Sequence, residues 1–430
     1  MDLKQVPLLN EQLKKCVRCG RCRTVCPVLA EIKNETVAPR GHIFMVQALR
    51  DGKVKPDAQV YDRLSNCLLC ETCSAVCPSG LDIPELNEYA RSYIYEKNPS
   101  LIKDTLFDSI WTRPSLLRTG GFFMWAANKS GLQGFARTLG LTKLLPGDLP
   151  KAEKIMHDPV MRSARSILPV INPPRGNTKY RVGYFLGCGT DLFSPSVAIA
   201  AVEVLTSWGC EVVIPDNMKC CGLPHIANGK MSTAQSLAIH NLKVFNDLEL
   251  DYIITDCGSC SSAISEKRLK MLLDKQGYDD QIDKFCSRVY DLNTFLLDVL
   301  QIDNRWLKPL NLKVTYHDPC HLAKAQGIRQ APRDILGLIP GLELIEMQDS
   351  DRCCGGSGTF SITHYDLSMK ILERKMKTIA DTGADVIATC CPSCTLQLKH
   401  GSNLHYSNTP VQHPVELLAL ASRQEPINNS

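Results

Sequence analysis

Short runs of apolar and β-branched residues recur in the second half of the chain. They read YRVGYFL, CEVVIP, DYIIT, KVTYH and ADVIATC, and they begin at residues 180, 210, 251, 313 and 384. Segments with apolar residues at helical spacing lie between them, such as PSVAIAAVEVLTSWG at 195–209. Alternation of short strands with helices predicts βαβ units around parallel sheets. In such sheets, ligand sites lie in the loops after the carboxyl ends of the strands.

The first half of the chain has a helical pattern. GHIFMVQALRDG at 41–52 predicts a short helix that Gly52 ends. Residues 98–178 predict a helical connector that ends in the loop INPPRGNTK, with breaks at Pro114, Gly120, Gly121 and Pro146. One face of this connector either lies on a membrane surface or packs on a neighbouring domain or partner. That face combines aromatic and basic residues: Phe122, Phe123, Trp125, Arg118, Lys129 and Arg137.

The segment after Lys179 contains an internal repeat. KYRVGYFLGCGT matches NLKVTYHDPCH, KCCGLPHIANG matches RCCGGSGTF, and DYIITDCGSCSSAI matches DVIATCCPSCTLQL. Each copy has one cysteine after a strand, then an adjacent pair, then a C-x2-C motif. The cysteines of the first copy are Cys188, Cys220, Cys221, Cys257 and Cys260, and those of the second are Cys320, Cys353, Cys354, Cys391 and Cys394. Because all of these positions follow strands or lie in Gly-rich loops, we expect each set to meet at one sheet edge.

Composition makes cysteine the distinguishing feature of the chain. The 430 residues are 44% apolar and 22% charged with a formal net charge of +4, which gives no argument for a nucleic-acid partner. There are 21 cysteines. The N-terminal MDLKQVPLLNEQLKK lacks the apolar core of a signal peptide, and no run has the length of a membrane span. We therefore expect a reducing compartment, cytoplasmic or peripheral on the inner face of the cell membrane, and thiols that bind metal.

Two cysteine runs near the N-terminus have identical spacing. Each has three cysteines in C-x2-C-x2-C order and a fourth, followed by proline, after three intervening residues. This is the pattern of bacterial two-cluster ferredoxins, in which the fourth cysteine ligates the other cluster. It predicts one [4Fe-4S] cubane on Cys16, Cys19, Cys22 and Cys77, and a second on Cys67, Cys70, Cys73 and Cys26.

Other assignments for the cysteines remain open at this point. Paired C-x2-C motifs also suit zinc, and a zinc ion in one copy of the repeat is a subsidiary option. Cys210, Cys286 and Cys390 fall outside the repeated pattern, and we interpret them as core thiols. Three histidines near the second copy either tune a metal group through hydrogen bonds or are structural: His317, His321 and His413.

These motifs resemble a known family over nearly the whole chain. The repeated pattern is similar to the cysteine-rich CCG domain of heterodisulfide reductase subunits, where such sites can bind non-cubane [4Fe-4S] clusters. A ferredoxin-like module followed by two CCG domains resembles the iron–sulfur subunits of glycolate oxidase, D-lactate dehydrogenase and anaerobic glycerol-3-phosphate dehydrogenase. APRGHIFMVQAL, CPSGLDIPELNEYAR, HDPCHLAKAQGIRQAPRDIL and HPVELLALA are most similar to the glycolate oxidase branch.

The resemblance implies an iron–sulfur electron-transfer subunit of a flavin-dependent 2-hydroxy-acid oxidase or dehydrogenase acting on glycolate or lactate. No G-x-G-x-x-G motif opens a helix after a strand, so FAD would belong to a partner flavoprotein subunit. A quinone or an electron-transfer flavoprotein would be the acceptor. The cofactors would be two cubanes and one or two further clusters in the CCG domains, and this chain would carry no catalytic residue.

Two alternatives have the same architecture. In one, the CCG clusters reduce a disulfide, as in heterodisulfide reductase. In the other, the chain is a subunit of anaerobic glycerol-3-phosphate dehydrogenase. The expected fold is α/β, with a ferredoxin-like helical two-cluster module at 1–97, the connector at 98–178, and duplicated βαβ CCG domains with parallel sheets at 179–308 and 309–424.

Overall fold

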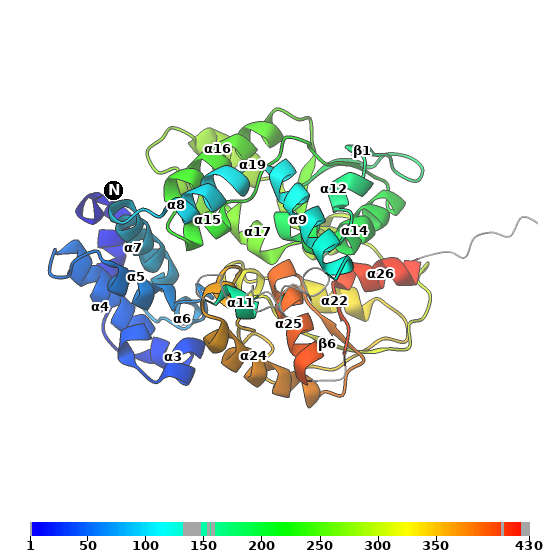
Figure 1. The fold of residues 1–430 in the computed structure, drawn as a ribbon. Helices are drawn as coiled ribbons and strands as arrows, with labels where there is room; N and C mark the ends of the chain where they lie inside the picture. Colours follow the sequence, from blue (N-terminus) through cyan, green and yellow to red (C-terminus); the bar gives the residue numbers. More distant parts are fainter. Residues whose placement is uncertain (1, 132–147, 153–154, 156–159, 406–407, 423–430) are drawn as a thin grey trace, which may run out of the picture.

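The computed structural model describes residues 2–131, 148–152, 155, 160–405 and 408–422. A helical module from the N-terminus lies at one end of the molecule (Figure 1). Two α/β units lie beside it, one coloured green and one yellow to red, and they pack against each other (Figure 1). This arrangement places both units within reach of the N-terminal module.

The N-terminal module consists of short helices. They are η1 (Leu3–Gln5), α1 (Pro7–Lys14), α2 (Arg21–Thr24), α3 (Pro27–Ile32), η2 (Glu35–Val37), α4 (Pro39–Arg50), α5 (Ala58–Ser65), α6 (Thr72–Ala75) and α7 (Ile83–Lys97). Proline stands at the start of α4 and of α7, where its missing N–H has no helical partner to lose. The predicted helix at 41–52 is α4, and Gly52 follows its end with a positive φ of 74°.

Five strands of the described chain form the sheet of the first α/β unit. They are β1 (Ile171–Asn172), β2 (Tyr180–Tyr184), β3 (Cys210–Val213), β4 (Tyr252–Thr255) and β5 (Val289–Asp291), in the order β1-β3-β2-β4-β5. Only β1 is antiparallel to its neighbour. The accompanying helices are α13 (Cys188–Phe193), α14 (Pro195–Ser207), α15 (Leu223–Ala227), α16 (Met231–Asn246), α17 (Gly258–Ala263), α18 (Glu266–Leu272), α19 (Asp279–Cys286), α20 (Leu292–Thr294) and η6 (Phe295–Val299).

The second α/β unit has a smaller sheet of the same kind. Its described strands are β6 (Lys313–Tyr316), β7 (Glu343–Leu344), β8 (Val386–Ala388) and β9 (Val411–Gln412), all parallel in the order β7-β6-β8-β9. Its helices are α21 (Cys320–Ala323), α22 (Ala331–Gly337), α23 (Phe360–Thr363), α24 (Tyr365–Ala380), α25 (Pro392–His405) and α26 (Pro414–Ser422). The predicted α/β class with duplicated parallel sheets is therefore confirmed.

The two copies of the repeat make equivalent contacts with each other. Helix α17 of the first unit packs on α21 of the second, and α25 of the second packs on α13 of the first. A Cβ at Gly258 would lie 2.8 Å from the Cβ of Leu322, and one at Gly189 would lie 2.9 Å from the Cβ of Pro392. These glycines allow the helices to approach closely. Because each of these helices begins beside a cysteine of the repeat, the packing brings the two cysteine sets together.

The connector between module and sheets is partly described. It contains α8 (Leu101–Asp104), η3 (Thr105–Ile110), α9 (Pro114–Lys129), α11 (Leu149–Ala152) and α12 (Ala164–Ile167). Phe122 and Phe123 of α9 are 48% and 66% exposed, while Arg137 of the predicted aromatic and basic face lies outside the described residues. Within the described ranges, every helix is too short or too polar to cross a bilayer. The domain limits set at 97, 178, 308 and 424 stay predictions.

A buried ion pair joins the N-terminal module to the first α/β unit. The guanidinium of Arg268 in α18 donates to the carboxylate of Glu88 in α7, and it lies 3.8 Å from the carboxylate of Glu71. The side chain of Glu88 is 1% exposed and that of Arg268 is 9% exposed. Arg91 adds hydrogen bonds to the backbone carbonyls of Cys67 and Ala227, at 2.7 and 2.8 Å. These contacts hold the second cysteine run of the module against the repeat.

Candidate metal centres

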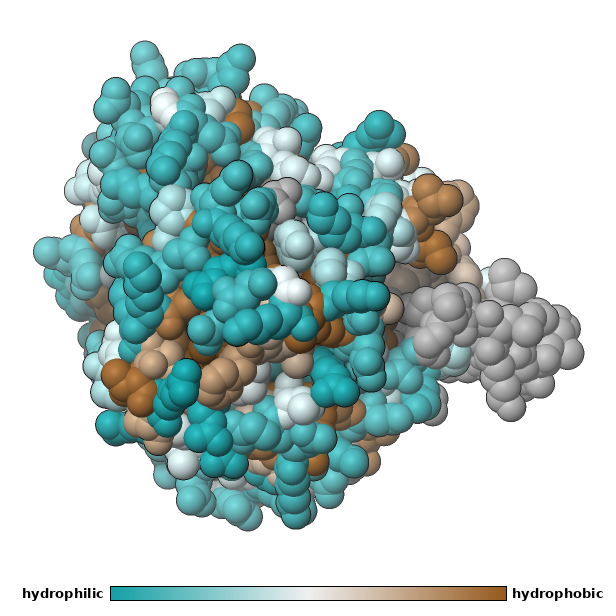
Figure 2. Space-filling view, turned by 90° about the vertical axis from the view of Figure 1, so that its left-hand side faces the viewer, coloured by the Kyte–Doolittle hydropathy of each residue, from teal (hydrophilic) through white to brown (hydrophobic). Residues whose placement is uncertain are grey.

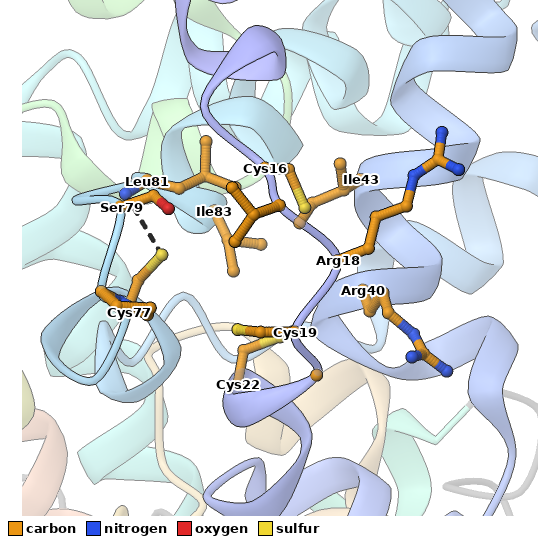
Figure 3. Close-up of a pocket in the computed structure, with 13 residues that line it drawn as sticks. Cys16, Arg18, Cys19, Cys22, Arg40, Ile43, Cys77, Ser79, Leu81 and Ile83 are labelled. Carbon is orange, nitrogen blue, oxygen red and sulfur yellow. Dashed lines mark hydrogen bonds between the residues drawn. The ribbon is translucent and has the colours of Figure 1, made fainter.

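Four cysteines from both runs of the N-terminal module surround one pocket, which we call the first thiol pocket. Its lining includes Cys16, Cys19, Cys22 and Cys77. Figure 3 shows Cys16, Cys19 and Cys22 on one stretch of chain and Cys77 on a separate loop across the pocket. Gly20, with a φ of 79°, makes the turn between the second and third cysteines. The structure thus brings together the four residues that the spacing groups.

The second thiol pocket lies between the same two runs and is lined by Cys26, Cys67, Cys70 and Cys73. Cys26 is the N-cap of α3, and its sulfur accepts a hydrogen bond from the backbone N–H of Leu29 at 3.5 Å. The prolines that follow Cys26 and Cys77 start a helix in one case and a turn in the other. Cysteines from each run therefore line both pockets, as crossed ligation requires.

The chemistry of both pockets suits a cationic metal group. Burial, together with the thiols of Cys70 and Cys67, raises the pKa of Cys26 to about 12. Burial also raises the pKa of Cys22, with additional contributions from Cys16, Cys19 and Cys77. Thiolates this crowded are stable only beside positive charge, which the irons of a cluster supply. Backbone N–H groups of Leu69 and Leu81 donate to the sulfurs of Cys67 and Cys77 at 3.4 Å, as donors to cluster ligands do.

The ten cysteines of the repeat form one continuous series of thiol contacts in the structure. The sulfurs of Cys188 and Cys220 are 3.9 Å apart. From there the series runs through neighbouring thiols in the order Cys188, Cys220, Cys221, Cys260, Cys257, Cys391, Cys394, Cys354, Cys353 and Cys320. We call the five thiols of the first copy the first cysteine-rich site and those of the second copy the second cysteine-rich site. Contact between Cys257 and Cys391 joins the two sites.

The thiol of Cys70 extends this series into the N-terminal module. It interacts with the thiols of Cys320 and Cys353, although Cys70 also lines the second thiol pocket. The second cysteine-rich site therefore lies next to the second thiol pocket, and the first cysteine-rich site lies beyond it. Sequence order does not reveal this arrangement, because the first copy of the repeat comes before the second along the chain.

The three histidines expected near the second copy differ in their contacts. The ring of His413 accepts a hydrogen bond from the N–H of Val415 and lies 3.1 Å from the carbonyl of Asp256, which is a structural role. His321 bridges Ser259 of the first unit and the carbonyl of Leu69. Both ring nitrogens of His317 lack a hydrogen-bond partner, and a ring nitrogen lies within 4.8 Å of the sulfurs of Cys354 and Cys394.

His317 keeps two assignments open for the second cysteine-rich site. A buried imidazole without a partner beside two thiols suits either a mixed sulfur and nitrogen zinc site or a donor to cluster sulfur. Among the cysteines outside the repeat, Cys210 is buried in β3 and Cys286 points to the carbonyl of Ile264 at 3.7 Å. Cys390 accepts hydrogen bonds from the hydroxyl of Tyr316 and the amide of Asn293, both at 3.4 Å.

Two buried lysines at the second cysteine-rich site were not predicted from the sequence. The side chain of Lys324 is 2% exposed and Lys375 is 1% exposed, and both act electrostatically on the thiols around them. Lys375 lies in the middle of the helical pattern of α24, where a lysine normally reaches solvent. No sequence pattern marks its burial, because the equivalent position of α16, Asn241, is known to be buried only from the structure.

Comparisons with known proteins agree with this architecture. The family model described as a 4Fe-4S dicluster domain matches residues 12–81. The model described as a cysteine-rich domain matches residues 182–265 and again 314–399. Residues 98–156 match the model of the linker region of the glycolate oxidase iron-sulfur subunit.

Three curated relatives cover much of the chain. The probable glycolate oxidase iron-sulfur subunit of Bacillus subtilis (strain 168) is 34% identical over 91% of this chain and 89% of its own length. Lactate utilization protein A of Halalkalibacterium halodurans is 31% identical over 55% of this chain and 96% of its own. A component of the dihydromethanophenazine:CoB--CoM heterodisulfide reductase of Methanosarcina barkeri is 25% identical over 95% of this chain and 94% of its own.

One solved structure shares the fold. A hypothetical protein from Helicobacter pylori superposes with a TM-score of 0.55 and 11% identity, over 98% of this chain and 73% of the other. At this identity the likeness extends to the fold alone.

Proposed function

Because the chain belongs to the family of glycolate oxidase iron–sulfur subunits, we propose that it carries electrons between a partner flavoprotein and an acceptor in a 2-hydroxy-acid oxidising complex. As an iron–sulfur subunit of an oxidoreductase, it needs no substrate site of its own. The substrate class rests on relatives whose names specify glycolate oxidase and lactate utilization. The flavin would lie on the partner, and a quinone or an electron-transfer flavoprotein would be the acceptor.

The observation that carries the proposal is the unbroken series of thiols from Cys188 to Cys70. It supports a row of adjacent metal groups that begins in the first cysteine-rich site, continues in the second, and reaches the two thiol pockets. [4Fe-4S] groups, when bound there, supply one-electron transfer. The residues of this chain provide the ligands, exclude water and donate N–H hydrogen bonds to sulfur. The buried cysteines of these sites include Cys257, Cys260, Cys353, Cys354, Cys391 and Cys394.

The first thiol pocket is the natural point of exchange with a partner. Cys19 is exposed, and the neighbouring Val17 is 69% exposed. The guanidinium of Arg18 lies 5.1 Å from the ring centre of Phe44, which is itself 42% exposed. Figure 2, which views the molecule from the end with the N-terminal module, shows a largely hydrophilic surface with small apolar areas. Such a mixed surface suits a transient electron-transfer contact.

The test is reduction of the chain by substrate through its partner. In the anaerobically purified complex, glycolate or D-lactate should produce the EPR signals of reduced clusters within this chain. The isolated chain should not respond to either acid. Reduction by glycerol 3-phosphate instead would assign the complex to that substrate.

A disulfide reductase is the second candidate, and one observation favours it. The chain aligns with a component of a heterodisulfide reductase over 95% of its length, and both copies of the repeat keep five cysteines. Reduction of a mixed disulfide by the isolated, dithionite-reduced chain would support this candidate and contradict a role limited to electron transfer. We expect no such turnover.

A further inference from the structure

The internal repeat allows each residue around one cysteine-rich site to be compared with its equivalent at the other. Cys188 aligns with Cys320, so Leu192 of the first copy stands where Lys324 stands in the second. Leu192 lies in the last turn of α13, and Lys324 directly follows the last residue of α21; each helix begins at the aligned cysteine. Leu192 is an apolar side chain that packs toward α9. A position that holds a neutral side chain in the first copy therefore holds a cationic side chain in the second.

A second pair of equivalent positions differs in the same direction. Gly222 packs on Ala234 of α16, and Gly355 packs on Ser368 of α24, which sets the alignment of the two helices. In that alignment Asn241 corresponds to Lys375. The amide of Asn241 hydrogen-bonds to the backbone of Lys219 and Cys220. A neutral amide thus occupies the place of the second buried lysine.

Lys324 is held between the second thiol pocket and the second cysteine-rich site. Its ammonium donates to the hydroxyl of Thr72 at 2.7 Å and to the carbonyl of Asp351 at 2.6 Å. The carboxylate of Asp351 is 3.9 Å from the ammonium, and its side chain is 40% exposed. Water therefore screens this ion pair, and the carboxylate neutralises the positive charge of Lys324 only weakly. The thiols of Cys320 and Cys353 lower the pKa of Cys70, and the ammonium of Lys324 adds to this shift. The pKa of Cys320 is raised, by the thiol of Cys70 and by burial, and the ammonium opposes that rise.

Lys375 interacts electrostatically with the adjacent cysteine pair of the second copy. It donates to the carbonyls of Asp349 and Ser350 at 2.5 and 3.3 Å and lies 3.8 Å from the sulfur of Met347. Burial lowers its pKa to about 8, while the thiols of Cys354, Cys320 and Cys353 act to raise it. Negative charge at the second cysteine-rich site therefore favours the charged ammonium.

The first cysteine-rich site has different charged neighbours. The thiol of Cys220 lowers the pKa of Cys188, and buried Asp191 opposes that shift. The equivalent of Asp191 in the second copy is Ala323. The backbone N–H of Arg165 donates to Asp191 at 2.9 Å. His225 lies near Cys221, but burial lowers its pKa, so this ring is neutral at neutral pH. The first site thus has neutral residues at the positions of the two lysines, and an acidic residue where the second site has an alanine.

We propose that Lys324 and Lys375 make the second cysteine-rich site the stronger electron acceptor of the pair. The inference rests on the proposed function, since it requires metal groups at both sites. An added electron brings one negative charge to the site and changes no covalent bond of the protein. The reduced flavin of the partner is the electron donor. The electron then distributes between the two sites according to their reduction potentials, which the surrounding charges set. A nearby buried ammonium stabilises the added charge, because the protein interior screens it poorly.

The test is an EPR-monitored redox titration of the full chain with its metal groups, using dithionite and mediators. Loss of a signal in Cys394→Ser assigns it to the second cysteine-rich site, and loss in Cys260→Ser assigns it to the first. Lys375→Gln removes the charge at similar side-chain length. We expect the equilibrium constant for reducing the second site to fall at least about tenfold, which lowers its reduction potential by about 59 mV for a one-electron couple. The first site should keep its potential.

Two further variants control for structural effects. Lys377→Gln removes an exposed charge from the same helix, and this 67% exposed side chain should have little influence on either potential. Asn241→Lys places the ammonium at the first site and should raise the potential of that site instead. If Lys375→Gln fails to bind iron, the potential of the first site in Asn241→Lys still tests the inference.

Iron per chain, measured in the same samples, separates the inference from the function on which it rests. A wild-type chain without iron at the cysteine-rich sites would contradict the proposed relay. Full iron with unchanged potentials in both Lys375→Gln and Asn241→Lys would overturn the inference. A second-site potential at or below that of the first in the wild type would do the same.

Discussion

Replacing Cys26 with serine should remove the metal group of the second thiol pocket and leave that of the first intact. Cys26 lines the second pocket although its own sequence run supplies three cysteines of the first. A serine oxygen is a poor substitute for the thiolate that a [4Fe-4S] group needs. We expect a loss of about four irons per chain, with the EPR signal of the first pocket retained.

Cys286→Ser is the matched control for this prediction. Its thiol is half-buried in α19 and contacts a backbone carbonyl rather than another thiol. It should keep the full iron content. Loss of the first-pocket signal in Cys26→Ser, with the second retained, would mean that each run holds its own group and that the ligation does not cross.

Replacing Arg268 with alanine should strongly destabilise the contact between the N-terminal module and the first α/β unit. The change leaves the carboxylates of Glu88 and Glu71 buried without their cation. Breaking a buried ion pair in this way costs about 3–5 kcal/mol. Anaerobic thermal unfolding of the chain at neutral pH should therefore show a large fall in the apparent midpoint.

The pH dependence of this effect follows from the carboxylates. Burial raises the pKa of Glu88 from 4.5, and Arg268 opposes that rise. Without Arg268 the folded-state pKa of Glu88 rises further, so the folded chain binds this proton more tightly than the unfolded chain does. The destabilisation is then complete above the raised pKa and fades as the pH falls toward 4.5.

Lys270→Ala in the same helix is the control for Arg268. This exposed lysine pairs with Glu266 and Asp283, where solvent screens the interaction. Its removal should shift the midpoint little at any pH. If the unfolding midpoint fell no further in Arg268→Ala than in Lys270→Ala, this would contradict a structural role for the buried pair.

Local patterns predicted the fold class and the cysteine groups for physical reasons. Three cysteines at C-x2-C spacing must share one tight loop. Cys16, Cys19 and Cys22 therefore come together for local reasons, and only Cys77 reaches the first thiol pocket from a distant segment. The strands beginning at Tyr180 and Lys313 are buried apolar runs, and such runs are evident in sequence. The family assignment and the α/β class were confirmed accordingly.

Contacts between distant segments could not be predicted in this way. That Cys70 meets Cys320 and Cys353 depends on how the module docks on the second α/β unit, which no local pattern encodes. The burial of Lys375 likewise follows from the packing of α24, since its helical pattern alone places no lysine inside. The same holds for the ion pair of Arg268, whose partners lie far away in sequence.

We propose that all four cysteine sites hold [4Fe-4S] groups and that these groups form one electron path. The most direct measurement is iron, acid-labile sulfide and zinc per chain in the complex purified without oxygen. We predict about sixteen irons with matching sulfide and no stoichiometric zinc. About eight irons with one or two zinc ions per chain would limit the clusters to the two thiol pockets and contradict a path through the repeat.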